Sequence, residues 1–349
     1  MTRPCISAAE ARTPCYVGID LGGTSVKLGV VDDLGRPLFR TTLDTHVENG
    51  PEDGACRMGR AVREAIAASG LPETAVARVG LGSPGILDVC AGVMVNPTNF
   101  PGWGGFPLRD RVSHHCGLPV ALVNDANAAA YGEFWVGSGR AFRSLVLLTL
   151  GTGVGCGIII GDVIVEGENG HGAECGHVLI DPSPRARRCS CGQTGHLEAY
   201  ASATGVIERA REALASGRQS TLVKRLAEGS HLTPLLLAQE AEAGDPLSTE
   251  IILRTAKYLA LGIVSVLHTI DPACVLLGGA MTFGGRESEL GRRFLREVGR
   301  HVKRRTFPTL AARLQIDFAS LGTEAGYLGA AGIARLEHHK RRRRASVWP

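Results

Sequence analysis

The chain has 349 residues, of which 44% are apolar and 21% are charged, values that suit a globular protein of two domains or one large domain. Its ten cysteines are scattered, which excludes the disulfide framework of a small secreted domain and favours a reducing compartment. The first 15 residues lack the apolar segment of a signal peptide, and no run reaches roughly 18 uninterrupted apolar residues. We therefore expect a soluble, cytoplasmic protein without a membrane span.

The net charge of +4 comes from the end of the chain, because residues 340–344 (KRRRR) alone carry five positive charges. Such a run can contact nucleic acid or anionic lipid, but it is more often a solvated, disordered end. We expect the second, and therefore no nucleic-acid partner.

Residues 16–43 predict a meander of three strands, because apolar runs rich in β-branched residues alternate with glycine turns. In the first turn, Gly22 and Gly23 remove side chains where a backbone must pass close to a ligand. The exposed amides of such a turn can bind phosphate oxygens, and Thr24 adds a hydroxyl group. An ordinary hairpin turn explains the same residues equally well.

A helix is predicted over residues 51–69 and a strand over residues 76–81. The loop at 96–103 follows, and its Thr98 and Asn99 offer neutral hydrogen-bonding groups that suit a polyhydroxylated ligand. Asx-type turn chemistry is the structural alternative.

A strand over residues 119–123 ends at Asn124 and Asp125, and a helix-forming segment (ANAAAYGEFW) follows. In open α/β sheets, ligands bind at the carboxyl edge, where such a junction places a carboxylate. Asp125 is therefore a candidate general base. A purely structural role as the helix N-cap is the alternative.

Residues 145–165 repeat the pattern of residues 16–43: a strand, the glycine turn Gly151-Thr152-Gly153, a strand, a turn and a strand. A duplication at a spacing of roughly 130 residues is too long for a solenoid and predicts two similar domains that face each other. Two phosphate-binding turns that meet across a cleft would form a nucleotide site. Two unrelated hairpins are the alternative.

Residues 171–198 contain His177, Cys189, Cys191 and His196 in the spacing H-x11-C-x-C-x4-H. Two thiolates and two imidazoles satisfy the tetrahedral preference of Zn²⁺ and leave no open position, so the predicted ion is structural. It would fix the backbone that carries the carboxylates of this segment. Incidental thiols and surface histidines are the alternative.

The rest of the chain predicts helices over residues 202–215 and 249–269, and strands over residues 274–277 and 314–318. Gly278 and Gly279 follow the first of these strands as a third turn of close approach. A last helix rich in small residues is predicted over residues 324–336.

The motifs DLGGT, NDANAAAYGE, LGTGVGCGI, ECGH to CSCGQTGHLE, and LLGGA follow one another in the order typical of the ROK family, which the chain resembles from Tyr16 to Arg335. The resemblance implies an α/β, actin-like, hexokinase-type (ribonuclease H-like) fold of two domains around a cleft. We expect residues 1–134 with 324–349 to form the smaller domain and residues 135–323 the larger.

The resemblance also implies roles for individual residues. Asp125 would be the general base, and Thr98, by its place in the loop, joins the candidate sugar-binding groups. The other residues expected to hold sugar hydroxyls are Asn99, Asn124, Glu174, His177 and Glu198. The residues expected to bind the nucleotide are Asp20, Gly22, Gly23, Thr24, Lys27, Gly151, Thr152, Gly153, Gly278 and Gly279, with Asp20 orienting Mg²⁺ through water.

The chain departs from the family pattern at His196, where the family usually has a third cysteine. Zinc accepts either donor set. Cys175 occupies a position that is usually apolar, and we expect it to be buried packing.

The resemblance is closest to bacterial glucokinases. We therefore expect ATP-dependent phosphorylation of D-glucose at O6, with ATP, Mg²⁺ and a structural Zn²⁺, in a homodimer. Kinases for N-acetylmannosamine, fructose or allose are alternatives, as are a sugar-responsive regulator without a DNA-binding domain and a catalytically silent binding protein.

Overall fold

The computed structural model describes residues 3–97 and 99–347. The chain divides into two compact units. The first consists of Met1–Ala141, Gly157–Ala173 and Ser320–Pro349, and the second of Phe142–Cys156 and Glu174–Ala319. The division into residues 1–134 with 324–349, and residues 135–323, stays a prediction.

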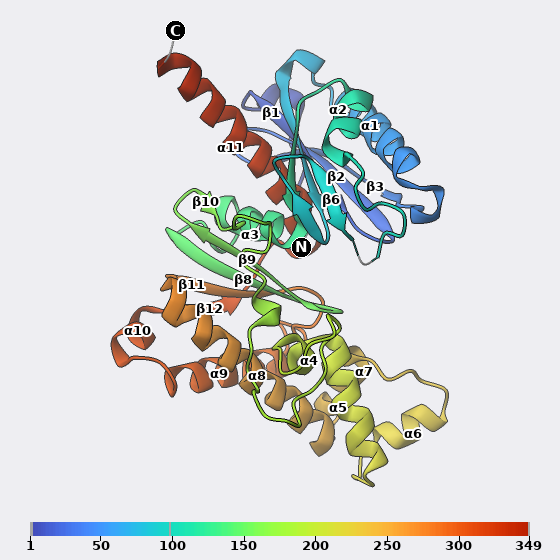
Figure 1. Cartoon of the computed structure of the whole chain (residues 1–349), viewed down its shortest axis with the longest axis vertical. Coiled ribbons are helices and arrows are strands. Elements are labelled where there is room, and N and C mark those ends of the chain that lie inside the picture. Colours follow the sequence, from blue (N-terminus) through green and yellow to red (C-terminus); the bar gives the residue numbers. More distant parts are fainter. Residues whose placement is uncertain (1–2, 98, 348–349) are drawn as a thin grey trace. The chain divides into compact units, whose positions relative to one another are not determined.

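The first unit is built on a mixed sheet with the strand order β3-β2-β1-β4-β7 (Figure 1). The strands β1, β2 and β3 form the predicted antiparallel meander, while β1, β4 and β7 run parallel. Parallel strands end at one edge, so the segments after β1, β4 and β7 come together there. The strands are β1 Cys15–Leu21, β2 Ser25–Val31, β3 Pro37–Asp44, β4 Val76–Ser83 and β7 Val120–Asn124.

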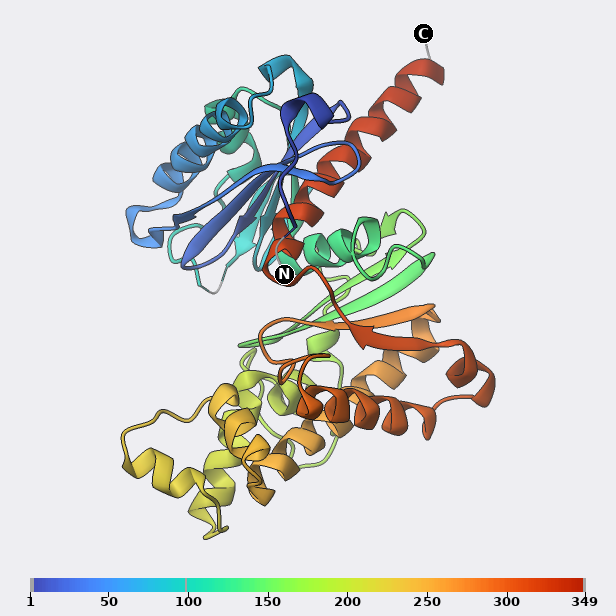
Figure 2. The ribbon, with the colours of Figure 1, turned by 180° about the vertical axis from the view of Figure 1, so that it is seen from behind.

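Helices cover both faces of this sheet. The helices α1 (Pro51–Ala68) and α2 (Leu108–Cys116) pack on one face, and α3 (Asp125–Trp135) and α11 (Ala325–Val347) pack on the other (Figure 2). The small residues of α11 allow a close approach, and a β-carbon added to Gly18 of β1 would lie 1.8 Å from the carbonyl oxygen of Tyr327. This confirms the predicted tight packing of the last helix.

Two features of the first unit differ from the prediction. Strands β5 (Ile86–Asp88) and β6 (Val93–Asn96) form a hairpin that sequence reasoning missed. The basic run was expected to be disordered, which is wrong for residues 340–343, because α11 continues through them to Val347. Lysine and arginine have good helix propensity, and their charges are favourable near the negative C-terminal end of the helix dipole.

Glu133 of α3 links this helix to the chain segment that leads into α11. Its carboxylate is fully buried and accepts hydrogen bonds from Ser138 and from the backbone amides of Ser320 and Leu321, at 2.8 and 2.6 Å. A buried charge with this many donors is well satisfied. Glu133 therefore fixes the entry into the last helix.

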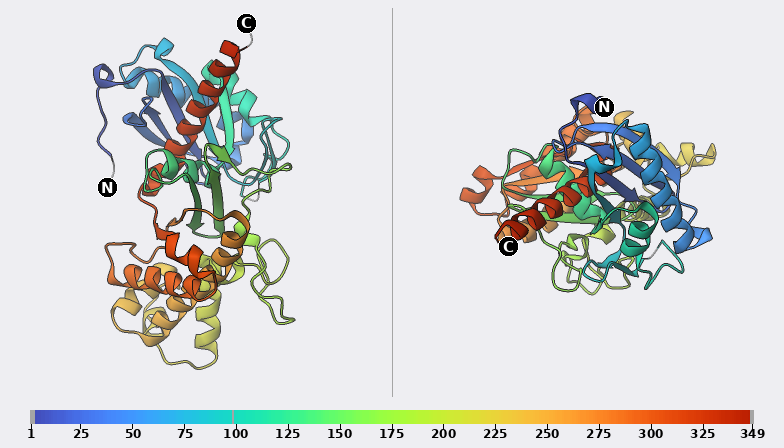
Figure 3. Two further views of the ribbon diagram at one scale, coloured as in Figure 1. Left: turned by 90° about the vertical axis from the view of Figure 1, so that its left-hand side faces the viewer. Right: turned by 90° about the horizontal axis from the view of Figure 1, so that it is seen from above.

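The second sheet has the strand order β10-β9-β8-β11-β12, which matches the first sheet position by position and confirms the predicted duplication. Helices of the second unit gather on one side of β8, β11 and β12 (Figure 3). The strands are β8 Ser144–Leu150, β9 Val154–Ile160, β10 Val163–Ile164, β11 Cys274–Gly278 and β12 Gln315–Phe318. The helices are α4 Glu198–Ala201, α5 Ala203–Ala215, α6 Leu222–Ala227, α7 Pro234–Glu242, α8 Pro246–Ile270, α9 Glu289–Lys303 and α10 Pro308–Arg313. Short 3-10 helices are η1 Ala8–Glu10, η2 Val47–Asn49, η3 Glu73–Ala75, η4 Cys175–His177 and η5 Gly322–Glu324.

The helix α8 is long and apolar enough to cross a membrane by length and composition, and 56% of its most apolar window is buried in the fold. It packs against α5, α7 and α9 of its own unit. These are the properties of the core helix of a globular unit, so α8 is weak evidence for a membrane span.

Candidate active site and metal centre

Asn124 and Asp125 lie at the carboxyl edge of the first sheet, where β7 ends and α3 begins. The N-cap is Asn124, whose Oδ1 accepts hydrogen bonds from the amides of Ala126 at 2.9 Å and Asn127 at 3.2 Å. The structural alternative for Asp125 as the cap is therefore wrong. Asp125 is the first helical residue, partly buried, and its Oδ1 accepts the Ala126 amide at 2.8 Å. Asp125 therefore lies at the positive end of the helix dipole, with its carboxylate at the carboxyl edge of the sheet.

The amide of Asn124 also donates to the carbonyl of Gly85 at 3.3 Å. Its neighbour on β4 is Ser83, which is fully buried and whose Oγ has no hydrogen-bond partner among the described residues. Asn127 is also buried, and its Oδ1 likewise has no hydrogen-bond partner among the described residues. Unpaired polar atoms beside Asp125 are what a site that binds a polar ligand would leave behind.

The first glycine turn joins β1 to β2 at this same edge. The turn closes by a hydrogen bond from the Gly22 amide to the Ser25 carbonyl at 3.0 Å, while the side chain of Thr45 holds the Gly22 carbonyl at 2.6 Å. Gly23 and Thr24 are exposed, so their amides are accessible to a ligand. The turn is therefore rigid at its base and open at its tip.

Asn99 lies beside this turn. A β-carbon added to Gly23 would be 4.0 Å from the β-carbon of Asn99, whose side chain is exposed. The first unit thus brings a predicted sugar-binding residue to the predicted phosphate-binding turn. Thr98, predicted with it, lies outside the described residues.

Asp20 is the last polar residue of β1 and pairs across the strands with Lys27. Burial raises the pKa of its carboxyl above the ordinary value, and the charge of Lys27 opposes this shift. A β-carbon added to Gly326 would lie 2.4 Å from the Asp20 carboxylate, so the start of α11 desolvates one side of it. A cation at Asp20 would offset the cost of burying its charge.

The second glycine turn has the corresponding place in the second unit. Its Gly151 carbonyl accepts from the amide of Ala203 at 2.8 Å, and the Thr152 carbonyl accepts from the hydroxyl of Thr204 at 3.2 Å. Both donors belong to the start of α5, which therefore supports the turn from one side. Thr152 itself is exposed.

Gly278 ends β11, which runs parallel to β8, and Gly279 follows it. Gly279 has a φ of +87°, and a β-carbon there would lie 2.3 Å from the carbonyl oxygen of Leu150, the residue just before the second turn. Only glycine combines this backbone conformation with so close an approach. The structure therefore brings the third glycine motif to the second.

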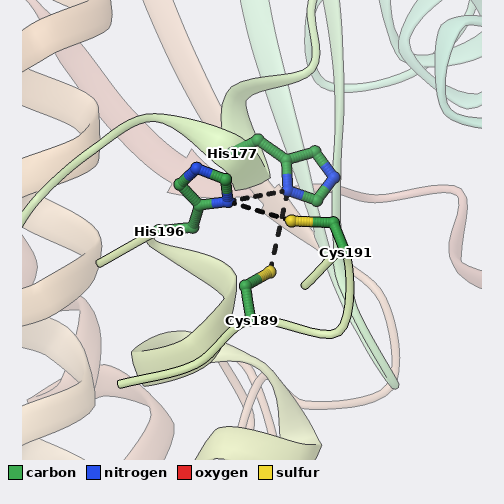
Figure 4. Close-up of side chains that lie close together, drawn as sticks. All are labelled: His177, Cys189, Cys191 and His196. Atoms are coloured by element: carbon green, nitrogen blue, oxygen red, sulfur yellow. Dashed lines mark hydrogen bonds between the residues drawn. The ribbon is translucent and has the colours of Figure 1, made fainter. Parts of the chain in front are cut away.

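The four predicted metal ligands come together in the second unit, with all four donor atoms within 4.8 Å of one another. Figure 4 shows both imidazoles turned toward the two thiol groups through Nδ1. The Nδ1 atoms of His177 and His196 are 3.3 Å apart. The Sγ of Cys189 lies 3.7 Å from Nδ1 of His177, and the Sγ of Cys191 lies 3.2 Å from Nδ1 of His196.

These separations fit a tetrahedral zinc ion. With Zn–N bonds of about 2.0–2.1 Å and Zn–S bonds of about 2.3 Å, a tetrahedron separates two nitrogens by about 3.3–3.4 Å and a nitrogen from a sulfur by about 3.5–3.6 Å. The N–N distance of 3.3 Å matches the expected value, and the two N–S distances, 3.7 and 3.2 Å, lie on either side of the expected one. Burial raises the pKa of the Cys189 thiol to about 11, so metal binding would have to displace its proton.

Glu198 connects the second glycine turn to the metal segment, the stretch from His177 to His196 that carries the four predicted metal ligands. Its Oε2 accepts the amide of Val154 at 3.0 Å, and its Oε1 accepts the hydroxyl of Ser190 at 2.5 Å. A β-carbon added to Gly153 would lie 2.4 Å from Oε2. One carboxylate therefore holds the residue between the two cysteines and the backbone that follows the turn.

Glu174 precedes η4 and is exposed, and its Oε2 lies 3.9 Å from Nε2 of His177. Because Nδ1 of His177 belongs to the metal cluster, Nε2 and the Glu174 carboxylate are the groups that this corner offers to a substrate. Cys175 is buried, as predicted, and it is hydrogen-bonded to the buried Cys156 of β9.

Sequence reasoning missed Ser190, Thr204 and Ser83. The contact of Thr204 with Thr152 joins segments 52 residues apart, and the unpaired Oγ of Ser83 is apparent only from its burial, so no local spacing indicates either residue. A hydroxyl between two predicted metal-ligating cysteines was the one available signal, and it pointed to Ser190.

Comparison with known proteins gives a consistent result. The sequence profile of the ROK family matches residues 16–337. The glucokinase of Thermotoga maritima is 35% identical over 319 residues, covering 91% of this chain and 96% of that protein. An N-acetylmannosamine kinase of Salmonella heidelberg is 33% identical over 322 residues, covering 91% and 98%. The crystal structure of a ROK family glucokinase from Streptomyces griseus in complex with glucose and AMPPNP has a TM-score of 0.72 and 32% identity, covering 92% and 99%. This likeness confirms the predicted fold class, an actin-like α/β fold of the hexokinase type.

Proposed function

The chain belongs to the ROK family and is a sugar kinase, and we propose that it transfers the γ-phosphoryl group of ATP to O6 of D-glucose. The observation that carries this proposal is the edge of the first sheet, where Asp125, Asn99 and the first glycine turn come together. Glucose is preferred because the relatives at 30–35% identity over nearly the whole chain include glucokinases.

Asp125 is the proposed general base. A sugar hydroxyl has too high a pKa to attack a phosphoryl group unaided, so a carboxylate within about 3 Å must accept its proton as the new bond forms. Asn124 caps α3 and thereby fixes the direction in which the next residue leaves the strand. The proton moves from the O6 hydroxyl to a carboxylate oxygen of Asp125, and the oxygen bonds to phosphorus as the bond to ADP breaks.

The sugar hydroxyls are held by neutral and charged side chains in this proposal. Asn99 and Asn124 donate and accept through their amides, and Glu174 and Glu198 accept through their carboxylates. His177 contributes Nε2, since its Nδ1 belongs to the metal cluster. Of these residues, Glu198 already accepts three hydrogen bonds, from Val154, Cys189 and Ser190, so it also acts by positioning the second glycine turn.

The phosphates of ATP are proposed to contact the amides of the two glycine turns, with Thr24 and Thr152 adding hydroxyls and Lys27 a positive charge. Phosphoryl transfer depends mainly on positioning and charge neutralisation, which such groups supply. Gly278 and Gly279 leave room for the adenosine. Mg²⁺, held through Asp20, would neutralise phosphate charge when bound.

A structural zinc ion is part of the proposal, held by His177, Cys189, Cys191 and His196. The donor set and spacing support it. The ion would order the backbone between Glu174 and Glu198 and supplies no open position for chemistry. The cytoplasmic location, the homodimer and the lack of a nucleic-acid partner stay predictions.

Another acceptor sugar is the second candidate, because the N-acetylmannosamine kinase of Salmonella heidelberg is 33% identical to this chain, against 35% for the glucokinase of Thermotoga maritima. Fructose and allose share most of the hydroxyl pattern that the named residues recognise. A regulator that binds sugar without turnover is disfavoured by Asp125, which such a protein does not need.

The test is a panel of sugars incubated with purified full-length protein and Mg-ATP, with ADP release followed by a coupled assay. We expect the highest kcat/KM with glucose, and glucose 6-phosphate as the product by phosphorus NMR. A higher kcat/KM with N-acetylmannosamine would transfer the assignment to that sugar. ADP release that does not depend on any sugar would refute the kinase assignment.

A further inference from the structure

Arg209 of α5 is buried, and no carboxylate among the described residues lies within ion-pair distance of it. The residue is 7% exposed. The guanidinium donates to the carbonyl of Ile251 at 3.2 Å and to the hydroxyl of Thr255, both on α8. Its Nε has no hydrogen-bond partner, and the side chain forms no ion pair, among residues 3–97 and 99–347.

Burying a charge in this way is costly, because neutral acceptors replace only part of the lost hydration. Burial lowers the pKa of Arg209 to about 10, and the nearby Tyr258 opposes this shift. The ring of Tyr258 lies 5.3 Å from the guanidinium carbon and compensates part of the charge through a cation–π contact. A negative ligand would compensate the rest.

Arg209 lines a cavity of about 300 Å³ at α5 and α8, the helices that pack against each other in the second unit (Figure 1). The charged residues around this cavity have an excess of cations. Four arginines face two glutamates, which leaves a net charge of +2. They are Arg187, Arg209, Arg218, Arg254, Glu212 and Glu250.

The two glutamates are already shared among the more exposed arginines. Arg218 pairs with Glu250 at 2.7 Å, and Arg254 lies 3.7 Å from the same carboxylate. Arg187 contacts both oxygens of Glu212. Exposed pairs of this kind are worth little and rearrange readily, so these guanidinium groups are available to a stronger acceptor.

Phosphate oxygens are that acceptor, since the planar guanidinium fork matches them in geometry and forms charge-assisted hydrogen bonds. The cavity is also large enough for more than a free ion, because 300 Å³ lies at the lower end of pockets that hold small organic ligands. We propose that this cavity is a binding site for a small phosphorylated anion, either inorganic phosphate or a phosphate monoester.

The backbone of Arg187 connects the proposed anion site to the metal segment through hydrogen bonds. The backbone amide of Arg187 donates to the hydroxyl of Tyr200 at 2.8 Å, and its carbonyl accepts from the amide of Gly195, next to the metal ligand His196. An anion that draws Arg187 away from Glu212 would move this support. Occupancy should therefore change KM for the sugar more than kcat, a consequence that rests on the proposed function.

The binding itself is tested without turnover. Inorganic phosphate and glucose 6-phosphate are titrated by calorimetry into full-length protein saturated with glucose and AMPPNP, so that the proposed active site is filled. We expect saturable binding, and the probe that binds more tightly identifies the source of the phosphoryl group. No saturable heat with either probe would overturn the proposal, and this outcome says nothing about sugar phosphorylation.

Variants locate the site. Arg209→Met, and separately the double variant Arg218→Gln with Arg254→Gln, should weaken binding of the better probe at least tenfold. The double variant changes only half-exposed or exposed side chains, so it remains informative if Arg209→Met does not fold. Arg211→Gln is the matched control, because Arg211 is an exposed residue of the same helix that pairs with Glu208 and does not line the cavity. Equal affinity in all of these proteins would overturn the assignment.

Discussion

The hydroxyl of Ser190 is expected to matter for catalysis although it has no assigned contact with a substrate. It donates to Oε1 of Glu198 at 2.5 Å, and the other oxygen of that carboxylate holds the Val154 amide at 3.0 Å, directly after the second glycine turn. Ser190 also lies between the two cysteines of the metal cluster. Ser190→Ala would remove one end of this connection and leave every proposed ligand in place.

The size of the effect follows from the kind of bond. A hydrogen bond to a charged group contributes about 1.5–3 kcal/mol where water cannot replace it. Ser190 is exposed, so water replaces part of the bond, and about 1 kcal/mol is a reasonable loss. About 1 kcal/mol corresponds to roughly a fivefold change in rate or affinity.

The assay is steady-state kinetics with glucose and Mg-ATP varied separately. For Ser190→Ala we expect kcat/KM for ATP to fall roughly fivefold, with a smaller change for glucose. Release of zinc to a chromophoric chelator should be faster than in the natural protein. The control is Ser183→Ala, a serine of the same segment whose Oγ has no part in the connection. Cys189 Sγ also donates to Glu198 at 3.5 Å, so unchanged kinetics for ATP in Ser190→Ala would refute the contribution of the Ser190 hydroxyl to this connection.

Three other predictions follow from single side chains. Glu133→Ala leaves buried donors unpaired and should cost about 3–5 kcal/mol, lowering the melting temperature by about 4–7 °C in calorimetry; a loss below about 1 kcal/mol would contradict the role of its carboxylate. Burial raises the pKa of Asp20, so the folded state holds the carboxyl proton more tightly than the unfolded state does. The free energy of unfolding of the natural protein therefore falls as the pH rises from about 4 through the raised pKa. Asp20→Asn lacks this loss, so in denaturant unfolding the free energy of unfolding of the variant should rise relative to that of the natural protein between about pH 4 and 7. A difference in free energy of unfolding that does not change with pH would be evidence against desolvation of Asp20. His196→Cys should retain about one zinc per chain by elemental analysis, whereas His196→Ala should lose it; about one zinc per chain in His196→Ala would exclude His196 as a ligand.

The strand–turn–strand units could be predicted from sequence because runs of β-branched residues end at glycine pairs, and this local pattern does not depend on distant contacts. Because the unit occurs twice in the sequence, two equivalent sheets could be predicted, and the two sheets have the same strand order. The gathering of His177, Cys189, Cys191 and His196 could be predicted because the spacing H-x11-C-x-C-x4-H already contains the four donors. These features are encoded locally.

Other features depend on which distant segments meet. Asn and Asp are both good N-caps, so the pair at 124 and 125 could not show which one caps α3 until the strand end was placed. The connection from Ser190 through Glu198 to Val154 joins three segments, and no spacing indicates it. The continuation of α11 through the basic run reflects helix propensity, which was outweighed in the prediction by charge.

The central claim is that the carboxylate of Asp125 accepts the proton of the sugar hydroxyl, and Asp125→Asn tests it most directly. The amide keeps the size of the side chain but accepts no proton, so kcat for glucose phosphorylation should fall by about 10²–10⁴-fold while calorimetry still detects glucose binding. A variant that binds glucose and keeps kcat within tenfold of the natural protein would contradict the claim.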